Sequence, residues 1–144
     1  MNPTAIQQAL ADQIEGQLGT AGTADPTIPN LQVTAEMNLY PSVPSIDIYP
    51  AEPFRTSFRT GSDDMTFFVR ARVHTADHVA GQQLLLSMMG DGDASLSQAI
   101  HSDRKLGNSV GGLAVTQVGG FGLFTDAGGE GSYLGALWTV RVVP

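Results

Sequence analysis

The sequence predicts a single α+β domain, in which an antiparallel or mixed sheet of about four to five strands is packed on one face by helices. Three observations predict this fold class. Apolar residues recur every fourth position near the N-terminus, as on one face of a helix. Apolar and polar residues alternate in several later stretches, as in half-buried strands. With 144 residues, the chain has the length of one domain that can bury a normal core.

The first expected element is an N-terminal helix over residues 3–18. Asn2 can cap it, and Pro3 would occupy the first helical position, where its missing N–H costs nothing. Residues 19–30 contain glycine, proline and polar residues, and are expected to form a linker. The apolar stripe of the helix consists of Ile6, Leu10, Ile14 and Leu18.

Three strands are expected next. Alternation over residues 31–39 predicts a half-buried strand, and residues 46–49 predict a short second one. Residues 65–74 alternate again and predict a third strand, after an extended loop over residues 51–64. Prolines cannot donate to a sheet ladder and should confine the first part of this region to a sheet edge or to bends. They are Pro41, Pro44, Pro50 and Pro53.

A central helix pair should follow. Thr75 or Asp77 can cap a helix that ends near Met89, where Gly90 provides a stop signal. Ser95 has capping-box spacing and should open a short helix that reaches about residue 102.

A closing hairpin should complete the domain. Residues 113–125 and 132–143 predict two strands around the turn-forming residues 126–131. The expected order is therefore helix, two strands, strand, helix pair and two strands. Such an order favours helices on one face of the sheet.

The charges of the chain are few and unevenly placed. Charged residues make up 15% of the sequence, and the net charge is −7. Residues 1–52 hold six acids and no Lys or Arg, whereas four of the seven basic residues lie between residues 55 and 72. Because an acidic chain without a basic cluster neutralises few phosphates, tight nucleic-acid binding is not expected. The asymmetry fits an acidic face that meets arginines of a second copy, or simply a solvated acidic surface.

The composition also bears on compartment. The chain has no cysteine, which excludes disulfides, thiolate metal sites and cysteine nucleophiles. Residues 1–4 carry no positive side chain and no apolar run, unlike a signal peptide. No apolar run approaches the roughly 20 residues that span a bilayer. We therefore expect a protein that is made and assembled in the cytoplasm.

Two patterns resemble known sites but lack required parts. Residues 107–111 match G-x-S-x-G, which needs a strand before its serine, a helix after it and a later histidine. Here a helix should precede and a strand follow, and no histidine occurs after His101. Asp91 and Asp93 begin like a calcium-binding loop, but the required glycine and the bidentate glutamate are missing. A flexible loop and a helix-to-helix turn are the interpretations we prefer.

A third pattern is a histidine pair. His74 and His78 lie four residues apart, but His74 should end a strand, so the two would not share the helical face that zinc binding needs. No nucleotide-binding fingerprint is present either. We expect no catalytic residue, no metal and no cofactor, and hence a protein that is not an enzyme.

The loop over residues 51–64 is unusual, because loops above about 12 residues are usually functional or disordered. It contains two Phe-Arg pairs, Phe54-Arg55 and Phe58-Arg59. Exposed phenylalanine is costly, and both residue types are favoured at interfaces. The loop could therefore be an arm that orders against a neighbouring subunit, with all four residues at the interface. Alternatively, it folds back on its own domain.

Several phrases of the chain together resemble tail-terminator and neck proteins of long-tailed bacteriophages. The resemblance spans roughly residues 3–143 and depends on element order and loosely matched phrases. These phrases are PSIDIYP, FFVRARV, ADHVAGQQLLLSMM, GDGDASLSQAI, LGNSVGGLAVTQV and SYLGALWTVRVV.

The resemblance implies a structural virion protein with an α+β fold that forms a homo-oligomeric ring, commonly hexameric. Such a ring stops tail-tube growth at the head-proximal end of the tail and joins the tail to the head connector. Its partners would be further copies, the tail tube protein and the head–tail connector proteins. DNA would pass through without specific binding, and an acidic lumen lined by Asp63 and Asp64 would serve this. The hairpin tip, with Asp126 and Glu130, would contact the tube or the connector.

Other functions remain open at this point. The nearest alternatives are a head-completion stopper and a tail-tube subunit. From other classes, a small hydrolase that uses residues 107–111, or a metal-binding protein, is possible in principle.

Overall fold

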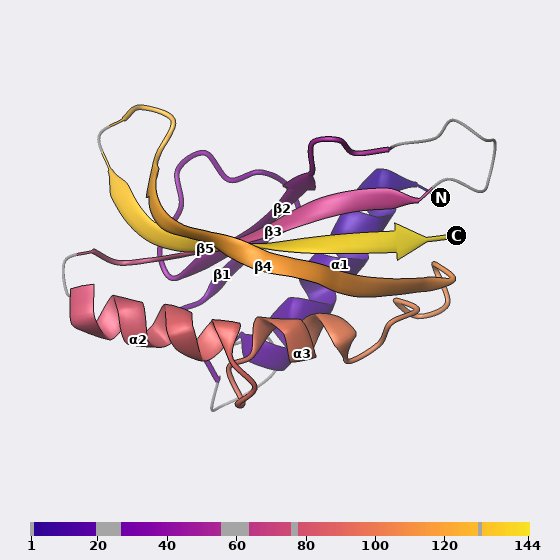
Figure 1. Ribbon diagram of the computed structural model, residues 1–144, viewed down its shortest axis with the longest axis horizontal. Helices are drawn as coiled ribbons and strands as arrows, with labels where there is room; N and C mark the ends of the chain where they lie inside the picture. Colours follow the sequence, from indigo (N-terminus) through magenta and orange to yellow (C-terminus); the bar gives the residue numbers. More distant parts are fainter. Residues whose placement is uncertain (1, 20–26, 56–63, 76–77, 130) are drawn as a thin grey trace.

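The computed structural model describes residues 2–19, 27–55, 64–75, 78–129 and 131–144, with the side chain of His78 left out (Figure 1). Within these residues, five strands form one open mixed sheet in the order β1-β2-β3-β5-β4, so the predicted α+β class is confirmed. β1 and β2 are parallel, and the other neighbours are antiparallel. The elements are α1 (Pro3–Leu18), β1 (Gln32–Thr34), β2 (Ser45–Pro50), β3 (Met65–Val73), α2 (His78–Met89), α3 (Leu96–His101), β4 (Gly112–Thr125) and β5 (Ser132–Val143).

Helix α1 has the predicted bounds and cap. The Asn2 side chain accepts hydrogen bonds from the backbone N–H groups of Thr4 and Ala5, which would otherwise lack a helical partner. The Gly19 N–H donates to the Glu15 carbonyl and ends the helix. All four residues of the predicted apolar stripe are at most 2% exposed.

Helix α3 begins as predicted, but only half of the capping box forms. Ser95 Oγ accepts from the Gln98 N–H at 3.2 Å. The Gln98 side chain does not return this bond to Ser95; its amide donates to the Asp91 carbonyl at 2.6 Å. It thereby ties α3 to the turn that follows α2. Of the two predicted caps of α2, Thr75 uses its hydroxyl to donate to the Ser132 carbonyl, and Asp77 lies outside the described residues.

The three helices cover one face of the sheet (Figure 1). α1 packs on β1 and β2, α2 on β3 and β5, and α3 on β4. The Gln13 side chain joins α1 to the end of α3 by donating to the carbonyls of Ala99 and Ile100. Every second residue of β3 and β5 points into this layer, and Phe67 and Trp138 at its centre are fully buried. Each such side chain contributes about 1.5–3 kcal/mol of burial free energy.

The strand predicted over residues 31–39 is wrong beyond Thr34, because β1 ends there. Since β1 and β2 are parallel, the chain must return to the start of β2, and residues 35–44 form this crossover. The crossover lies on the face opposite the helices. Its residue Asn38 forms hydrogen bonds to Asp47 and Arg72. Along β2 and β3 these two residues alternate with residues that face the helical layer, so their side chains point to the other face of the sheet. We call this second face the outer face.

The prolines lie where a missing N–H disturbs no ladder. Pro41 and Pro44 are in the crossover, Pro50 is the last residue of β2, and Pro53 follows it. The hairpin of β4 and β5 forms as predicted, with two register shifts in β4.

Candidate functional site: an apolar surface fixed by a buried ionic cluster

Three charged side chains meet on the outer face beneath the crossover. Asp47 on β2 is the cross-strand partner of Arg70 on β3, and Arg72 follows on the same face. Arg70 donates to both carboxylate oxygens of Asp47, at 3.1 Å from Nε and 2.6 Å from Nη2. Arg72 Nη2 lies 3.3 Å from the same carboxylate. The side chains of Asp47 and Arg72 are 0% and 1% exposed, so these charges are held almost entirely out of water.

Aromatic rings complete the surroundings of the two arginines. The Arg70 guanidinium lies 5.0 Å from the Tyr49 ring and 5.7 Å from the Phe124 ring, and Arg72 lies 6.0 Å from the Tyr133 ring. Cation–π attraction adds to the ion pairs. Burial lowers the pKa of Arg72, against the opposing effect of Asp47, and burial raises the pKa of Tyr49. Arginine stays protonated despite such a shift, so one carboxylate here faces two positive charges.

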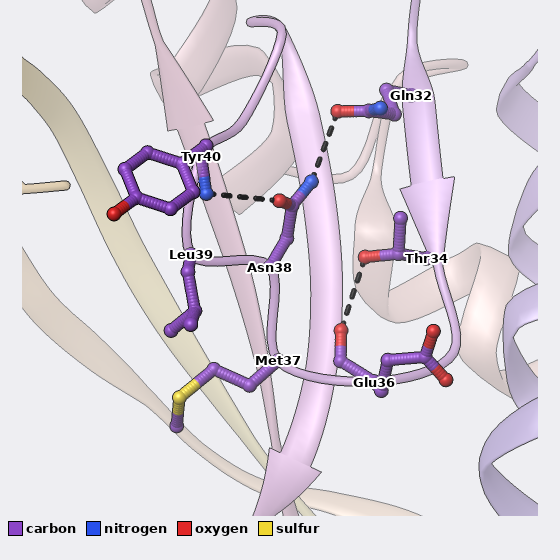
Figure 2. Close-up of a pocket in the computed structure, with 7 residues that line it drawn as sticks. All are labelled: Gln32, Thr34, Glu36, Met37, Asn38, Leu39 and Tyr40. Atoms are coloured by element: carbon purple, nitrogen blue, oxygen red, sulfur yellow. Dashed lines mark hydrogen bonds between the residues drawn. The ribbon is translucent and has the colours of Figure 1, made fainter. Parts of the chain in front are cut away.

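The ionic cluster fixes the backbone of the crossover at Asn38. The Asn38 N–H donates to the Asp47 carboxylate at 2.9 Å, and Arg72 Nη2 donates to the Asn38 carbonyl at 2.8 Å. The Asn38 side chain donates to Gln32 Oε1 at 3.0 Å and accepts from the Tyr40 N–H at 3.2 Å (Figure 2). Both backbone groups and both side-chain atoms of Asn38 are thus used to hold this segment in place.

The same segment also reaches the far hairpin. The Leu39 carbonyl accepts from the N–H of Ala127, in the turn between β4 and β5, at 3.1 Å. Thr34 Oγ1 donates to the Glu36 carbonyl at 3.1 Å at the other end of the segment (Figure 2). The crossover is therefore tied to β1, β2, β3 and the hairpin at once.

Beside the fixed backbone, three large apolar side chains project outward. Met37, Leu39 and Tyr40 are 47%, 52% and 68% exposed. In Figure 2 they point away from Gln32 and Thr34, on the opposite side of the segment. A pocket of about 230 Å³ is lined by residues 32, 34 and 36–40. Single exposed apolar residues are ordinary, but three within four residues of a fixed segment make this segment a candidate interaction site. We call Met37, Leu39 and Tyr40 the crossover patch.

The arm residues predicted for a subunit interface are only partly described. The Phe54 ring packs edge-on against the core residue Phe67, with the ring centroids 5.2 Å apart, and the Phe54 carbonyl accepts from the Thr66 N–H. Phe54 thus follows the alternative in which the loop folds back on its own domain. Arg55 is half-buried, whereas Phe58 and Arg59 lie outside the described residues. Contact of these residues with a neighbouring copy stays a prediction.

The residues predicted to face the lumen or the tube are dispersed. Asp64 accepts hydrogen bonds from Nε and Nη2 of Arg141, so its charge is matched within its own chain. Asp126 opens the β4–β5 turn, where its N–H donates to the Gly131 carbonyl and its carbonyl accepts from Gly129. Asp63 and Glu130 lie outside the described residues. Asp126 lies beside the crossover patch, because the N–H of the next residue, Ala127, donates to the Leu39 carbonyl. The roles of the whole set in lumen or tube contact stay predictions.

The serine motif occupies a loop between α3 and β4, in the expected order. Gly107 and Asn108 adopt positive φ angles of 65° and 69°, and Ser109 is exposed. The Asp103 carboxylate accepts from the N–H groups of Lys105 and Gly107, and these bonds lower its pKa.

The candidate metal ligands of the sequence lie at two separate places on the surface. Asp91 and Asp93 are exposed in the turn between α2 and α3, and His74 is exposed after β3. Within the described residues, no group of three or more His, Cys, Asp or Glu side chains could hold a metal ion. No described helix is both long and apolar enough to span a bilayer.

Sequence reasoning missed the crossover patch and its ionic support. The available signal was the pair of prolines in residues 41–44 soon after a strand pattern, together with charges at alternate positions of two predicted strands. The segment that Asp47 and Arg72 hold depends on how β2 and β3 pair, and the pairing of distant strands cannot be read from the pattern of residues within one strand. No protein-family model matches this chain, and no curated protein matches it.

Proposed function

We propose that this protein is a structural subunit of a tailed-phage virion. It assembles into a ring, hexameric as in the family it resembles, that caps the tail tube and joins the tail to the head connector. In this role it acts through contacts with other copies, with the tube and with the connector, and carries out no chemistry.

The observation that supports a contact function best is the crossover patch. A buried ionic cluster fixes the segment through Asn38, yet the apolar side chains beside it lie in water. A partner that covers them would recover about 25 cal/mol for each Å² of apolar surface removed from water. Because the backbone is already ordered, little conformational entropy is lost on binding. The virion role itself comes from the resemblance of the sequence phrases.

Electron microscopy of tails that carry a labelled copy of this chain tests the proposal. We expect rings of the purified protein, and the label at the head-proximal end of the tail. A label at the distal tip would contradict the terminator role. Long cylinders formed by the purified protein alone would show a tube subunit instead.

A further inference from the structure

Strand β4 forms one edge of the open sheet (Figure 1), and its own chain covers this edge at both ends. Near the start of the strand, the Val115 N–H donates to Nε2 of His101, the last residue of α3, at 2.9 Å. Just beyond the end of the strand, the Ala127 N–H donates to the Leu39 carbonyl of the crossover at 3.1 Å. Residues 117–125 form the part of the edge between these two contacts.

The pairing of β4 with β5 determines which backbone groups point out of this edge. Along an antiparallel pair, residues that exchange hydrogen bonds alternate with residues whose N–H and C=O point away from the neighbouring strand. The Asp126 N–H donates to the Gly131 carbonyl, so these two opposed residues are hydrogen-bonded. By the register, Phe124 is hydrogen-bonded as well, whereas the backbone groups of Leu123 and Thr125 point outward. In the described part of the chain, no hydrogen bond from another element uses these outward groups.

The same stretch lacks the protection that natural edge strands usually have. Such strands are blunted by charged side chains, prolines or bulges. β4 contains no Asp, Glu, Lys, Arg or Pro. Its second register shift, between Gly119 and Gly122, interrupts the edge, but Gly122–Thr125 pair with β5 without a further shift. Leu123 in this regular stretch is 71% exposed. An uncharged edge of this kind is a template for pairing with another strand.

We infer that two copies of this chain pair antiparallel through Gly122–Thr125 of β4, about a two-fold axis that passes beside Phe124. In this register, Leu123 of each copy lies opposite Thr125 of the other. Both residues point their N–H and C=O outward, so each of these Leu123–Thr125 pairs exchanges two hydrogen bonds. The edge is therefore complementary to a second copy of itself, and one continuous sheet runs through both copies.

The side chains that this register brings together are compatible. Phe124 lies opposite Phe124 of the second copy in a non-hydrogen-bonded pair, where side chains are closest. Cross-strand aromatic pairs of this kind stabilise a sheet. Gly122 of each copy lies opposite Asp126 of the other, so no two like charges are opposed across the axis.

The pairing also covers exposed apolar residues beside the paired stretch. The register carries Phe121 of each copy, which is 43% exposed, toward Ala127 of the other. The Ala127 N–H is already bonded to Leu39, so strand pairing stops there and Phe121 meets the crossover beside Leu39. Removal of these apolar side chains from water adds to the backbone hydrogen bonds.

This contact is separate from the contacts of the proposed ring. A two-fold contact joins two copies by the same surface and does not close a ring. The pairing therefore goes beyond the proposed function and does not depend on it. Where the chain also forms rings, the pairing connects one ring to another.

Cysteine cross-linking of the purified protein tests the pairing, because the chain has no native cysteine. Phe124→Cys places a thiol beside the two-fold axis, opposite the same thiol of the second copy and within the reach of a disulfide. Under mild oxidation we expect covalent dimers. Gln8→Cys, on the exposed side of α1, is the control and should remain monomeric.

A second pair of variants separates the backbone from the side chain. Leu123→Pro removes an outward N–H that β5 does not use, so the hairpin itself should be preserved. In the Phe124→Cys background it should lower the yield of covalent dimers about tenfold, since each copy loses a hydrogen bond to the other. Leu123→Ala keeps this N–H and should cross-link nearly as well as Phe124→Cys alone. Equal yields for the proline and alanine variants would overturn the pairing.

Hydrogen exchange of the wild-type protein tests the same contact without any substitution. On dilution, the amides of Leu123 and Thr125 should exchange faster as the dimer dissociates, whereas the Phe124 amide, bonded within the hairpin, should stay slow. Exchange at Leu123 and Thr125 that does not depend on protein concentration would overturn the inference. So would a folded Phe124→Cys protein that gives no more covalent dimer than Gln8→Cys. The position of the chain in tails, seen by microscopy, decides the proposed function separately.

Discussion

Asp47 is the residue on which the outer face depends most directly. Its carboxylate joins two arginines of β3 and the backbone of Asn38, and it is fully buried. A buried ion pair adds little net stability over an apolar pair, but removal of one partner leaves an uncompensated charge. Here the uncompensated charges would be those of Arg70 and Arg72.

Asp47→Asn should therefore lower the free energy of unfolding by about 3–5 kcal/mol. Urea unfolding followed by circular dichroism measures this. Asp64→Asn is the matched control, because Asp64 also pairs with an arginine, but with side chains that are 28% and 58% exposed. It should cost less than about 1 kcal/mol. Equal losses for the two variants would show that the buried cluster does not support the fold.

His101 should make stability depend on pH. Its Nε2 accepts the Val115 N–H at 2.9 Å, so this bond needs the neutral ring, and burial together with Arg104 lowers the pKa of His101 below its usual 6.5. The unfolded chain then takes up the proton more readily than the folded one. Stability should be fully present above pH 6.5 and decline as the pH falls below that value.

Thermal unfolding of the wild type and of His101→Gln between pH 8 and pH 5 checks this expectation. The glutamine side-chain carbonyl can accept the Val115 N–H at any pH. The wild type should lose more stability than the variant over this range, since other groups titrate equally in both. Parallel pH profiles for the two proteins would exclude the role assigned to His101.

At the scale of elements, the sequence predicted those helices and strands whose bounds follow from residues within the element itself. Helix α1 was predicted with its bounds and cap, because the stripe, Asn2 and Pro3 all lie within the segment itself. β3 and the β4–β5 hairpin followed from alternation and turn residues in the same way. The crossover was not predicted, since the bonds that hold it at Asn38 come from Asp47 and Arg72, which are distant in sequence.

Loss of the Asn38 side chain should loosen the whole crossover, because this side chain connects it to β1 and to the Tyr40 backbone. Asn38→Ala keeps the backbone bonds to the ionic cluster but removes the bonds to Gln32 and Tyr40. We expect a loss of about 1–2 kcal/mol. Hydrogen exchange should become faster at the Tyr40 amide, which loses its acceptor, and at the Ser42 amide, whose acceptor Gln32 Oε1 is no longer held by Asn38. Gln8→Ala, which removes an exposed bond to Asp12 on α1, should change neither. Unchanged exchange in Asn38→Ala would mean that the cluster alone holds the segment.

At the scale of the whole molecule, one face of the sheet builds the core and the other holds the crossover. The helical layer buries the large apolar side chains, including Trp138 and Phe67, and provides the stability of the domain. The outer face instead uses charges, aromatic rings and one asparagine to present the crossover patch. The fold class was predictable because it follows from element order, whereas the patch depends on which side chains remain exposed after folding.

Because the core and the crossover patch lie on different faces of the sheet, a variant should be able to lose assembly and keep its free energy of unfolding. Replacing Met37, Leu39 and Tyr40 together with Gln should change the free energy of unfolding by no more than about 0.5 kcal/mol per residue, because these side chains are exposed. The same variant should fail to assemble, as judged by sedimentation. A variant with the same number of changes at Gln8, Asp91 and Thr116, which are exposed elsewhere, is the control and should assemble normally.

A cryo-electron microscopy reconstruction of tails that contain this protein tests the central claim most directly. The account predicts a ring of this chain at the head-proximal end, in which Met37, Leu39 and Tyr40 are covered by a neighbouring subunit of the virion. A chain found at the distal tip, or a ring in which these three side chains face solvent, would contradict it.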